Sequence, residues 1–381
     1  MLSIEQMKRH FDLGKIETPV LIMDKRIIKR KYREISESLK GVKVFYAVKA
    51  NSHPEILKYL ASLGSGFEVA STGELNDLLK IGVDPKKIIT SNTLKMPEFI
   101  KSAYQAGVEY YAYDCEMEID KLSELAPGVK VYLRIVVDNS GSEWPLSNKF
   151  GADPSRALEL LKYAKRSRVV PCGITFHVGS QCLNPLNWSN ALITTAEIFH
   201  LARKIGIELK VINLGGGIPV KHLKKTPKLA EIKWQIEKIL NDAFNDFTDL
   251  EMMIEPGRAL VGDAGNMVTS VIAKAERGSE NWLYLDVGVF NGLMETIEGF
   301  GYELVSEKEL SGFEDKMEMA LYTVAGPSCD SVDTMFKDYR LPKDLTVGDL
   351  IYIKNAGAYT LSYASNFNGM DPPKVLFIEE K

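Results

Sequence analysis

A lysine stands at the end of an apolar run in the segment VFYAVKAN, residues 44–51. The residues before Lys49 are typical of a buried strand, and an unpaired ammonium is costly to bury. Burial also lowers the pKa of a lysine, which makes the neutral amine available as a nucleophile. Lys49 is therefore a candidate Schiff-base residue. From this stretch alone, a structural lysine held in an ion pair is the open alternative.

Further polar and glycine residues could act together with the Lys49 amine. Gly215-Gly216-Gly217 would let backbone N–H groups approach a phosphate closely, although a tight turn also explains such a run. Arg258 could hold a phosphate, Glu255 could hold a proton on a ring nitrogen, and His177 is either a ring-stacking group or a hydrogen-bonded core histidine. Pyridoxal phosphate (PLP) needs such partners, because an acid beside its ring nitrogen makes the ring an electron sink.

Short β-branched or aromatic runs alternate with helical patterns over about 215 residues. Eight such runs occur, at 42–49, 66–71, 87–92, 110–114, 129–137, 169–180, 209–217 and 251–258. Strands that alternate with helices indicate a parallel sheet, and eight units match a (β/α)8 TIM barrel, which has about 250 residues. A doubly wound open sheet is the rival, but its glycine-rich turn follows the first strand, whereas here the glycines follow the seventh.

Polar or glycine residues close every one of these runs. Barrel enzymes place their chemistry at the carboxyl ends of the strands, so the pattern predicts one shared pocket at the barrel mouth. The residues at the run ends are Lys49, Glu68, Ser71, Ser91, Asn92, Asp114, Arg134, His177, Ser180, Gly215, Gly216, Gly217, Glu255 and Arg258.

After Gly262 the alternation of strands and helices ends, and strand-like runs follow one another with few helical patterns between them. We expect a C-terminal antiparallel β-sandwich or barrel domain, which the early run 19–23 joins. The predicted domains are a barrel at 26–262 and a β domain made of 1–25 and 263–381. A basic amphipathic helix is expected from Lys25 to Lys40, with its charge on a solvated face.

The composition of the 381 residues excludes several classes of function. The net charge is −4, so the protein has no overall positive charge that would attract nucleic acid or an anionic membrane. No stretch approaches ~18 consecutive apolar residues, and the N-terminus lacks a signal-peptide pattern. The four cysteines fit neither a metal-site spacing nor a disulfide framework, so we expect a cytoplasmic protein without a metal.

The motifs together resemble one family, the barrel-type (alanine-racemase-like, group IV) PLP-dependent ornithine/lysine decarboxylases. The resemblance covers nearly the whole chain, and the motifs occur in the family's order. They are FYAVKAN, FEVASTGEL, NKFG, FHVGSQ, LGGGIP, EPGR, GPSCDSVD and NAGAYT followed by FNG. The combination is specific to the family, whereas FEVAS or GGG alone would not be.

The resemblance implies a role for each matched residue. Lys49 would carry the cofactor as a Schiff base, and Glu255 would pair with the pyridine nitrogen. His177 would stack on the ring, Arg134 would lie near the phenolic oxygen, and Glu68 would support the lysine region, although some relatives have Asp there. The phosphate would be bound by a larger set: Ser180, Gly215, Gly216, Gly217, Arg258 and Tyr359.

The resemblance also implies a homodimer whose active sites are shared across the interface. The loop GPSCDSVD would reach the partner subunit's site, where Cys329 would protonate the α-carbon after CO2 leaves and Asp330 would bind the distal ammonium. A small packed thiol is the alternative for Cys329. Lys149 would pair across the interface with Asp333.

The implied activity is decarboxylation of a basic amino acid, with ornithine the first choice and lysine possible. The products would be the diamines putrescine and cadaverine, which belong to polyamine biosynthesis. Glu295 or a neighbouring group, with Glu298 nearby, would tune chain length. A diaminopimelate decarboxylase is an alternative, but its cysteine motif carries Glu where Asp330 stands. An alanine racemase would lack the cysteine loop, and a non-catalytic, protein-binding homologue would lose site residues that this chain keeps.

Overall fold

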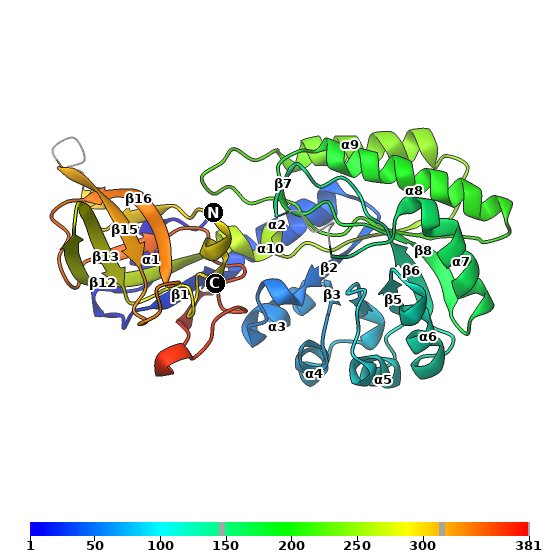
Figure 1. Ribbon diagram of the computed structural model, residues 1–381, viewed down its shortest axis with the longest axis horizontal. Coiled ribbons are helices and arrows are strands. Elements are labelled where there is room, and N and C mark those ends of the chain that lie inside the picture. The colour runs from blue at the N-terminus through cyan, green and yellow to red at the C-terminus, as the bar shows by residue number, and fades with distance from the viewer. Residues whose placement is uncertain (145–148, 312–316, 380–381) are drawn as a thin grey trace.

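The computed structural model of the protein describes residues 1–144, 149–311 and 317–379. The chain forms two parts that lie side by side, a barrel surrounded by helices and a curled β sheet (Figure 1). The NKFG motif is described from Lys149 onward, and its first residue, Asn148, lies outside the described residues.

Eight parallel strands of the described chain close into a barrel in the order β10-β11-β2-β3-β4-β5-β6-β8. Their bounds are β2 Val42–Ala47, β3 Gly66–Glu68, β4 Ile88–Thr90, β5 Tyr110–Tyr113, β6 Lys130–Arg134, β8 Val170–Thr175, β10 Val211–Asn213 and β11 Glu251–Ile254. Each predicted run forms one of these strands, so the predicted (β/α)8 barrel is confirmed. The strands end earlier than the runs, because the polar run ends belong to the loops of the mouth.

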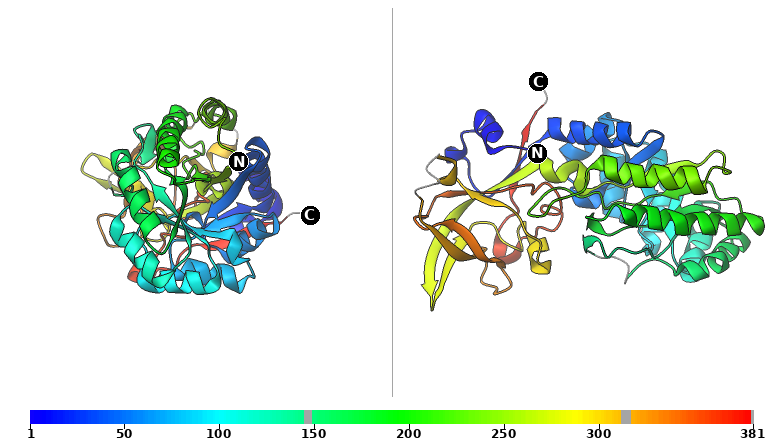
Figure 2. Two further views of the ribbon diagram at one scale, coloured as in Figure 1. Left: turned by 90° about the vertical axis from the view of Figure 1, so that its right-hand side faces the viewer. Right: turned by 90° about the horizontal axis from the view of Figure 1, so that it is seen from above.

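A ring of helices covers the outside of the barrel, as the left view of Figure 2 shows. They are α2 Lys25–Ser38, α3 Pro54–Ser62, α4 Thr72–Lys80, α5 Pro97–Ala106, α6 Glu116–Leu125, α7 Ala157–Arg166, α8 Leu186–Lys204 and α9 Leu229–Ala243. The predicted basic helix is α2, and it contacts both α3 and α9, so it completes the ring. None of the helices in the described ranges combines the length and apolar character that crossing a membrane would need.

The barrel interior is closed at its amino-terminal end by an apolar layer. Phe45, Ile89, Val211 and Met253 form this barrel floor, and Cys172 packs against it. Successive side chains on a strand point to opposite faces, so residues two positions further along face the same interior. These next interior positions carry polar groups, including Ser91, Asn213 and Glu255. The floor therefore lies directly beneath the mouth.

The second part is a curled sheet in the order β14-β17-β12-β13-β15-β16, with β1 bonded to β12 and β18. Its bounds are β1 Val20–Asp24, β12 Gly265–Arg277, β13 Glu280–Leu285, β14 Leu304–Ser306, β15 Met319–Ala325, β16 Thr334–Pro342, β17 Leu350–Ile353 and β18 Lys374–Ile378. The early strand joins this sheet as expected. Two pairings, β1 with β18 and β13 with β15, are parallel, so the sheet is mixed and not wholly antiparallel. The predicted domain boundaries stay a prediction.

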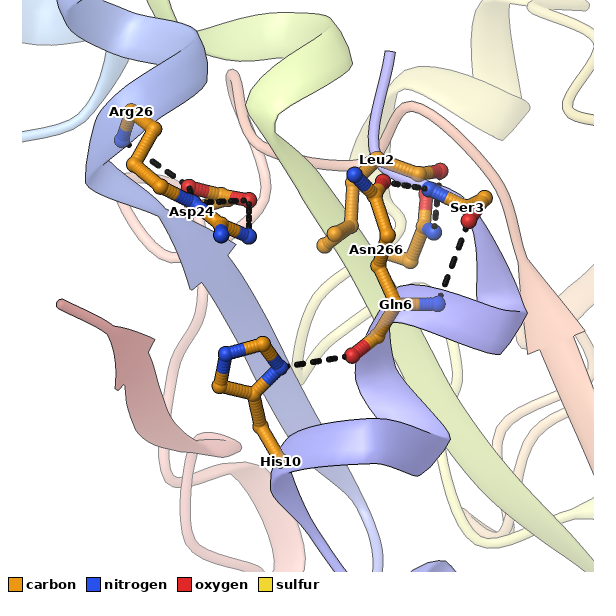
Figure 3. A network of polar contacts seen from close by, with 7 residues as sticks. All are labelled: Leu2, Ser3, Gln6, His10, Asp24, Arg26 and Asn266. Carbon is orange, nitrogen blue, oxygen red and sulfur yellow. Dashed lines mark hydrogen bonds and ion pairs between the residues drawn. The ribbon is translucent and has the colours of Figure 1, made fainter. Parts of the chain in front are cut away.

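A hydrogen bond between Asn266 and Leu2 joins the N-terminal residues to this sheet (Figure 3). Helix α1 (Ile4–His10) begins with a capping box, in which Ser3 and Gln6 exchange hydrogen bonds. The Asn266 side-chain amide on β12 donates to the Leu2 carbonyl over 3.1 Å. Further elements are the short pair β7 (Ser142–Trp144) and β9 (Ser180–Cys182), the helix α10 (Arg258–Val261), which follows β11, and several short 3-10 helices.

Candidate active site

The carboxyl ends of the barrel strands meet around one cavity. Residues from four strand ends and from the β domain line it: Ala47, Lys49, His177, Ser180, Gln181, Gly216, Gly217, Ile218, Glu255, Gly257, Arg258 and Tyr359. The structure therefore brings together in one cavity most of the cofactor residues predicted from the sequence. Cys329, Asp330 and Glu295 are not part of this lining.

Lys49 lies in a short 3-10 turn, Val48–Ala50, directly after β2. Its side chain is open to solvent at the mouth, and not buried as the apolar run suggested. Desolvation lowers the Lys49 pKa, but Glu68, Tyr359 and Glu255 raise it, and the net pKa lies above its usual value. The expected lowering of the pKa is thus wrong, because Glu68, Tyr359 and Glu255 together outweigh the desolvation.

Glu255 follows β11 and is held by a hydrogen-bond network. The Ser91 hydroxyl and the Asn213 amide both donate to its Oε1, the amide over 2.5 Å. Ser91 Oγ also lies 2.7 Å from the hydroxyl oxygen of Tyr132. Burial first, and the nearby Glu68 second, raise the pKa of Glu255 to about 7. A carboxyl poised in this range can share a proton with a pyridine nitrogen.

The glycine run after β10 makes a cradle that side chains would fill. Gly215 and Gly217 have φ of 62° and 103°, the left-handed region that favours glycine. A Cβ on Gly217 would come within 2.6 Å of the Gly179 carbonyl oxygen, and one on Gly216 within 3.0 Å of His177 Nε2. The backbone therefore packs too closely here for side chains, and the N–H of Gly215 already donates to Asn213 over 3.0 Å. Gly216 and Gly217 line the cavity, where glycine backbone can approach an anionic ligand such as a phosphate closely.

His177 and Arg134 lie at neighbouring strand ends of the mouth. Desolvation, with the positive charges of Arg134 and Lys49, holds the pKa of His177 well below its usual value, so the imidazole is neutral. Its Nδ1 accepts from the Gly179 N–H over 3.0 Å. Desolvation also lowers the pKa of Arg134, while nearby Glu255 acts against it. The Glu68 carboxylate is buried and accepts from the Ser91 N–H over 3.4 Å.

Arg258 begins α10, and its guanidinium is paired with the β domain. Glu295 receives Nη1–H over 3.0 Å and Nη2–H over 2.5 Å. Tyr359 lies beside Arg258 and has a φ of 56°, a strained conformation for an aromatic residue that is found at functional sites. Glu295 is thus bound to Arg258, whereas the sequence predicted that it contacts the substrate and tunes its chain length.

The loop Gly326–Asp333 lies on the β domain. Cys329 and Asp330 are exposed, and the Cys329 N–H donates to the Asn368 side chain over 3.4 Å. Asp333 is buried and accepts from the N–H groups of Val289 and Ser328, so it fixes the base of the loop within its own chain. Lys149 is exposed, with its ammonium 5.0 Å from the Phe150 ring centre. Its pairing with Asp333 across an interface stays a prediction.

The residues of the cavity fit PLP. The mouth offers an amine, a carboxyl whose pKa is about 7, a glycine cradle that any Cβ would fill and a buried arginine whose Nε has no partner in the described chain. Sequence reasoning missed the residues that hold these groups: Asn213, Tyr132, Tyr302 and Trp144. Asn213 was detectable in principle, since it is an amide two positions after an interior valine of the same strand.

Comparison with known proteins supports this arrangement. The profile of the pyridoxal-binding domain of pyridoxal-dependent decarboxylases matches residues 25–262. The lysine/ornithine decarboxylase of Selenomonas ruminantium is 35% identical over 370 residues, which cover 96% of this chain and 91% of the relative. Antizyme inhibitor 2 of Xenopus laevis is 33% identical over 359 residues, covering 91% and 78%. The S. ruminantium lysine decarboxylase SrLDC, in complex with PLP and cadaverine, has a TM-score of 0.89 at 35% identity, with 100% of this chain and 95% of that chain covered.

The matched profile covers more than half of the chain, and the chain accordingly belongs to the PLP-dependent decarboxylases. Within that class it is a member of the ornithine/lysine decarboxylase family. The protein is thus an amino-acid carboxy-lyase that uses PLP, as the sequence predicted.

Proposed function

We propose that the protein removes CO2 from L-ornithine, and to a lesser extent from L-lysine, to give putrescine and cadaverine. The observation that carries the proposal is the meeting of Lys49, Glu255 and Arg258 in one cavity at the barrel mouth. These three groups would contact three parts of PLP: its aldehyde, its ring nitrogen and its phosphate.

When bound, PLP supplies a carbonyl carbon for an amine and a ring that accepts the electron pair released with CO2. Lys49 is the amine at the mouth, and it is the group that the amino group of the substrate would displace. Glu255 would keep the proton on the ring nitrogen, while Ser91 and Asn213 hold its Oε1 in place. The neutral imidazole of His177 can lie against a ring face without adding charge there.

The phosphate would lie in the cradle of Gly215-Gly216-Gly217, with Ser180, Tyr359 and Arg258 around it. Backbone N–H groups and a guanidinium are strong partners for a dianion in a site with little solvent. This end of the cavity would hold the cofactor but take no part in bond breaking.

The cavity needs a second subunit to be complete. Its lining in the described chain offers one carboxylate, that of Glu255, which two side chains already bind. A diamino acid places a cation at the far end, so a further acidic group is required. Asp330 and Cys329 are exposed on the β domain. In a homodimer, this loop would enter the partner's mouth, where Asp330 binds the distal ammonium and Cys329 returns a proton to the α-carbon.

Ornithine and lysine differ by one methylene, which a pocket distinguishes by only ~1–3 kcal/mol. Acceptance of both substrates is therefore part of the proposal. The name of the S. ruminantium relative, which mentions both amino acids, supports it. The sequence predicted Glu295 as the residue that tunes the choice, but its bidentate contact with Arg258 argues for another role.

A second candidate function is regulation by protein binding, which the similarity to Antizyme inhibitor 2 favours. A non-catalytic homologue has no need of a lysine, an acid and a phosphate cradle in one cavity, and this chain keeps all three. Diaminopimelate decarboxylation is a third candidate, against which Asp330 stands, because diaminopimelate decarboxylases carry Glu at this position of the cysteine motif.

The decisive experiment is to measure CO2 release from ornithine, lysine, arginine and meso-diaminopimelate in parallel. The proposal expects turnover of ornithine above lysine, and little from the other two. If only diaminopimelate were turned over, diaminopimelate would be the substrate in place of ornithine and lysine. No turnover of any substrate by protein loaded with PLP would favour the regulatory candidate.

A further inference from the structure

The Arg258 guanidinium is bound at one end by a carboxylate from the other domain. Its Nη1 and Nη2 donate to the two oxygens of Glu295, a bidentate pair that is almost completely buried, with side chains 4% and 8% exposed. The Tyr302 hydroxyl donates to Glu295 Oε2 over 3.1 Å. Both Glu295 oxygens therefore have partners, and a substrate ammonium would have to displace a bidentate arginine to reach them.

Aromatic rings fix the plane of the same guanidinium. Its central carbon lies 4.7 Å from the ring centre of Tyr359, 4.9 Å from that of Phe300 and 5.3 Å from that of Trp144. A planar cation is attracted to aromatic faces, so these rings restrict its tilt while Glu295 restricts its direction. Little orientational freedom remains for Arg258.

The donors of the guanidinium that Glu295 leaves for other partners are Nε–H and the outer N–H of each terminal nitrogen. An arginine has five N–H donors, and Glu295 takes one from each terminal nitrogen. Nε is buried and has no partner in the described part of the chain. Arg258 also lines the cavity with Ser180, Gly216 and Gly217. One guanidinium can therefore join the Glu295 carboxylate on one side to an anion in the glycine cradle on the other.

We propose that Glu295 is a positioning residue for the cofactor phosphate, and not a residue that reads the chain length of the substrate. It presents Arg258 to the phosphate in a fixed orientation, and Tyr302 supports it. This inference rests on the proposed function, since it takes the glycine cradle as the phosphate site. Because Glu295 lies in the turn Met294–Glu298 of the β domain, both domains then contribute to cofactor binding.

The alternative role for Glu295 is to offset the charge of Arg258, and the two roles predict opposite results. A carboxylate near the phosphate repels it, so a residue that only neutralised Arg258 would weaken phosphate binding. Its removal would then tighten the binding of PLP. If Glu295 positions the guanidinium, its removal weakens binding, because a freed arginine must be ordered again by the ligand.

The test compares Glu295→Gln with Glu298→Gln, an exposed glutamate in the same turn. Purified protein is stripped of cofactor and titrated with PLP, followed by absorbance. We expect the PLP dissociation constant to rise about tenfold or more in Glu295→Gln and to stay within about twofold of wild type in Glu298→Gln. The 31P resonance of the bound cofactor should shift only in the first. At saturating PLP, the ratio of kcat/KM for ornithine to that for lysine should stay unchanged.

Unchanged or tighter PLP binding in Glu295→Gln overturns the inference, and so does a shifted substrate ratio with normal PLP binding. Should Glu295→Gln fail to fold, as circular dichroism would reveal, Tyr302→Phe gives a second test, with an expected loss of PLP affinity of about two- to fivefold and an unchanged substrate ratio. Wild-type protein that binds no PLP would overturn the proposed function itself, which keeps the two failures apart.

Discussion

The floor and the mouth of the barrel are built from the same strands but differ in chemistry. At the floor, Ile89, Val211 and Met253 pack in an apolar layer. Two positions along the same strands, about 7 Å away, the interior residues are polar and hydrogen-bonded. They are Ser91, Asn213 and Glu255. Apolar burial at the floor holds the strands together, so the mouth can carry groups that are costly to bury.

The largest expected effect is at the mouth. Lys49→Ala should lower CO2 release at least about a thousandfold, because no other amine replaces the one that binds PLP covalently. The unfolding free energy should change little, since the lysine is open to solvent. Borohydride reduction followed by mass spectrometry should find PLP attached to the wild-type chain and absent from the variant.

Lys43→Ala is the matched control for this prediction. Lys43 lies on the same strand, is largely exposed, and pairs with Glu251 over 2.8 Å at the opposite end of the barrel. It should retain activity and the covalent PLP. If Lys49→Ala lowered CO2 release no more than Lys43→Ala does, the predicted difference between the two ends of the strand would be wrong.

The second effect concerns the loop that completes the mouth. Cys329→Ala and Lys49→Ala should each be inactive or nearly so, but mixtures of the two should regain up to about one quarter of wild-type activity. The reason is that random exchange of subunits makes half of the dimers mixed, and each mixed dimer has one intact mouth. Activity of the mixture over time is the measurement. No recovery, although size-exclusion experiments show subunit exchange, would place Cys329 in the mouth of its own chain.

The third prediction concerns the contribution of the barrel floor to stability. Met253→Ala should lower the unfolding free energy by about 2–4 kcal/mol, because the Met253 side chain is fully buried and its loss leaves a cavity. Urea unfolding measures the change, and kcat at saturating PLP should stay within about twofold. Met117→Ala, at a methionine that is 77% exposed, should change stability by less than about 0.5 kcal/mol. A large loss of kcat in Met253→Ala would mean that floor and mouth are coupled.

The smallest effect is a pH dependence of stability from the mouth. Burial first raises the pKa of Glu74 to about 7, and Glu68 adds to it against the hydrogen bond from Ala70 N–H. An unfolded glutamate titrates near 4.5. Between these values the folded chain holds more protons than the unfolded chain, so stability falls as pH rises, by up to about 3 kcal/mol for this group.

Glu74→Gln should flatten that slope, as measured by urea unfolding between about pH 4.5 and about pH 8. The exposed Glu124, changed to Gln, serves as the control and should leave the slope as it is. If the unfolding free energy depended on pH equally in wild type and Glu74→Gln, the prediction would be wrong. Burial of the Glu74 carboxyl would then not reduce stability at high pH.

Much of the barrel could be predicted from the sequence, because each strand is a compact apolar run that ends in a polar residue. Lys49, Glu255 and Arg258 were found by this rule. Strand β16 was not predicted, since Lys337, Asp338 and Arg340 interrupt its apolar residues. Charges on the solvent face of a sheet break the pattern from which strands are recognised.

The environment of the site residues was beyond the reach of sequence reasoning. The net pKa of Lys49 depends on Glu68 and Glu255, which come from other strands and approach it only once the barrel closes. The pairing of Arg258 with Glu295 joins two domains across 37 positions, and no local spacing relates them. Such contacts are set by the tertiary structure, whereas propensity and periodicity are local.

Strand β1 has a consequence for how the chain is made. It pairs with β18, whose partner residues are synthesised roughly 350 positions later. At about 5–20 residues per second, a ribosome needs about 20–70 s to cover that interval. During this time the barrel can already fold, while the apolar strand β1 lacks its neighbour β18. Until β18 has been synthesised, the nascent protein therefore has an unpaired strand edge at β1, with which another chain can pair.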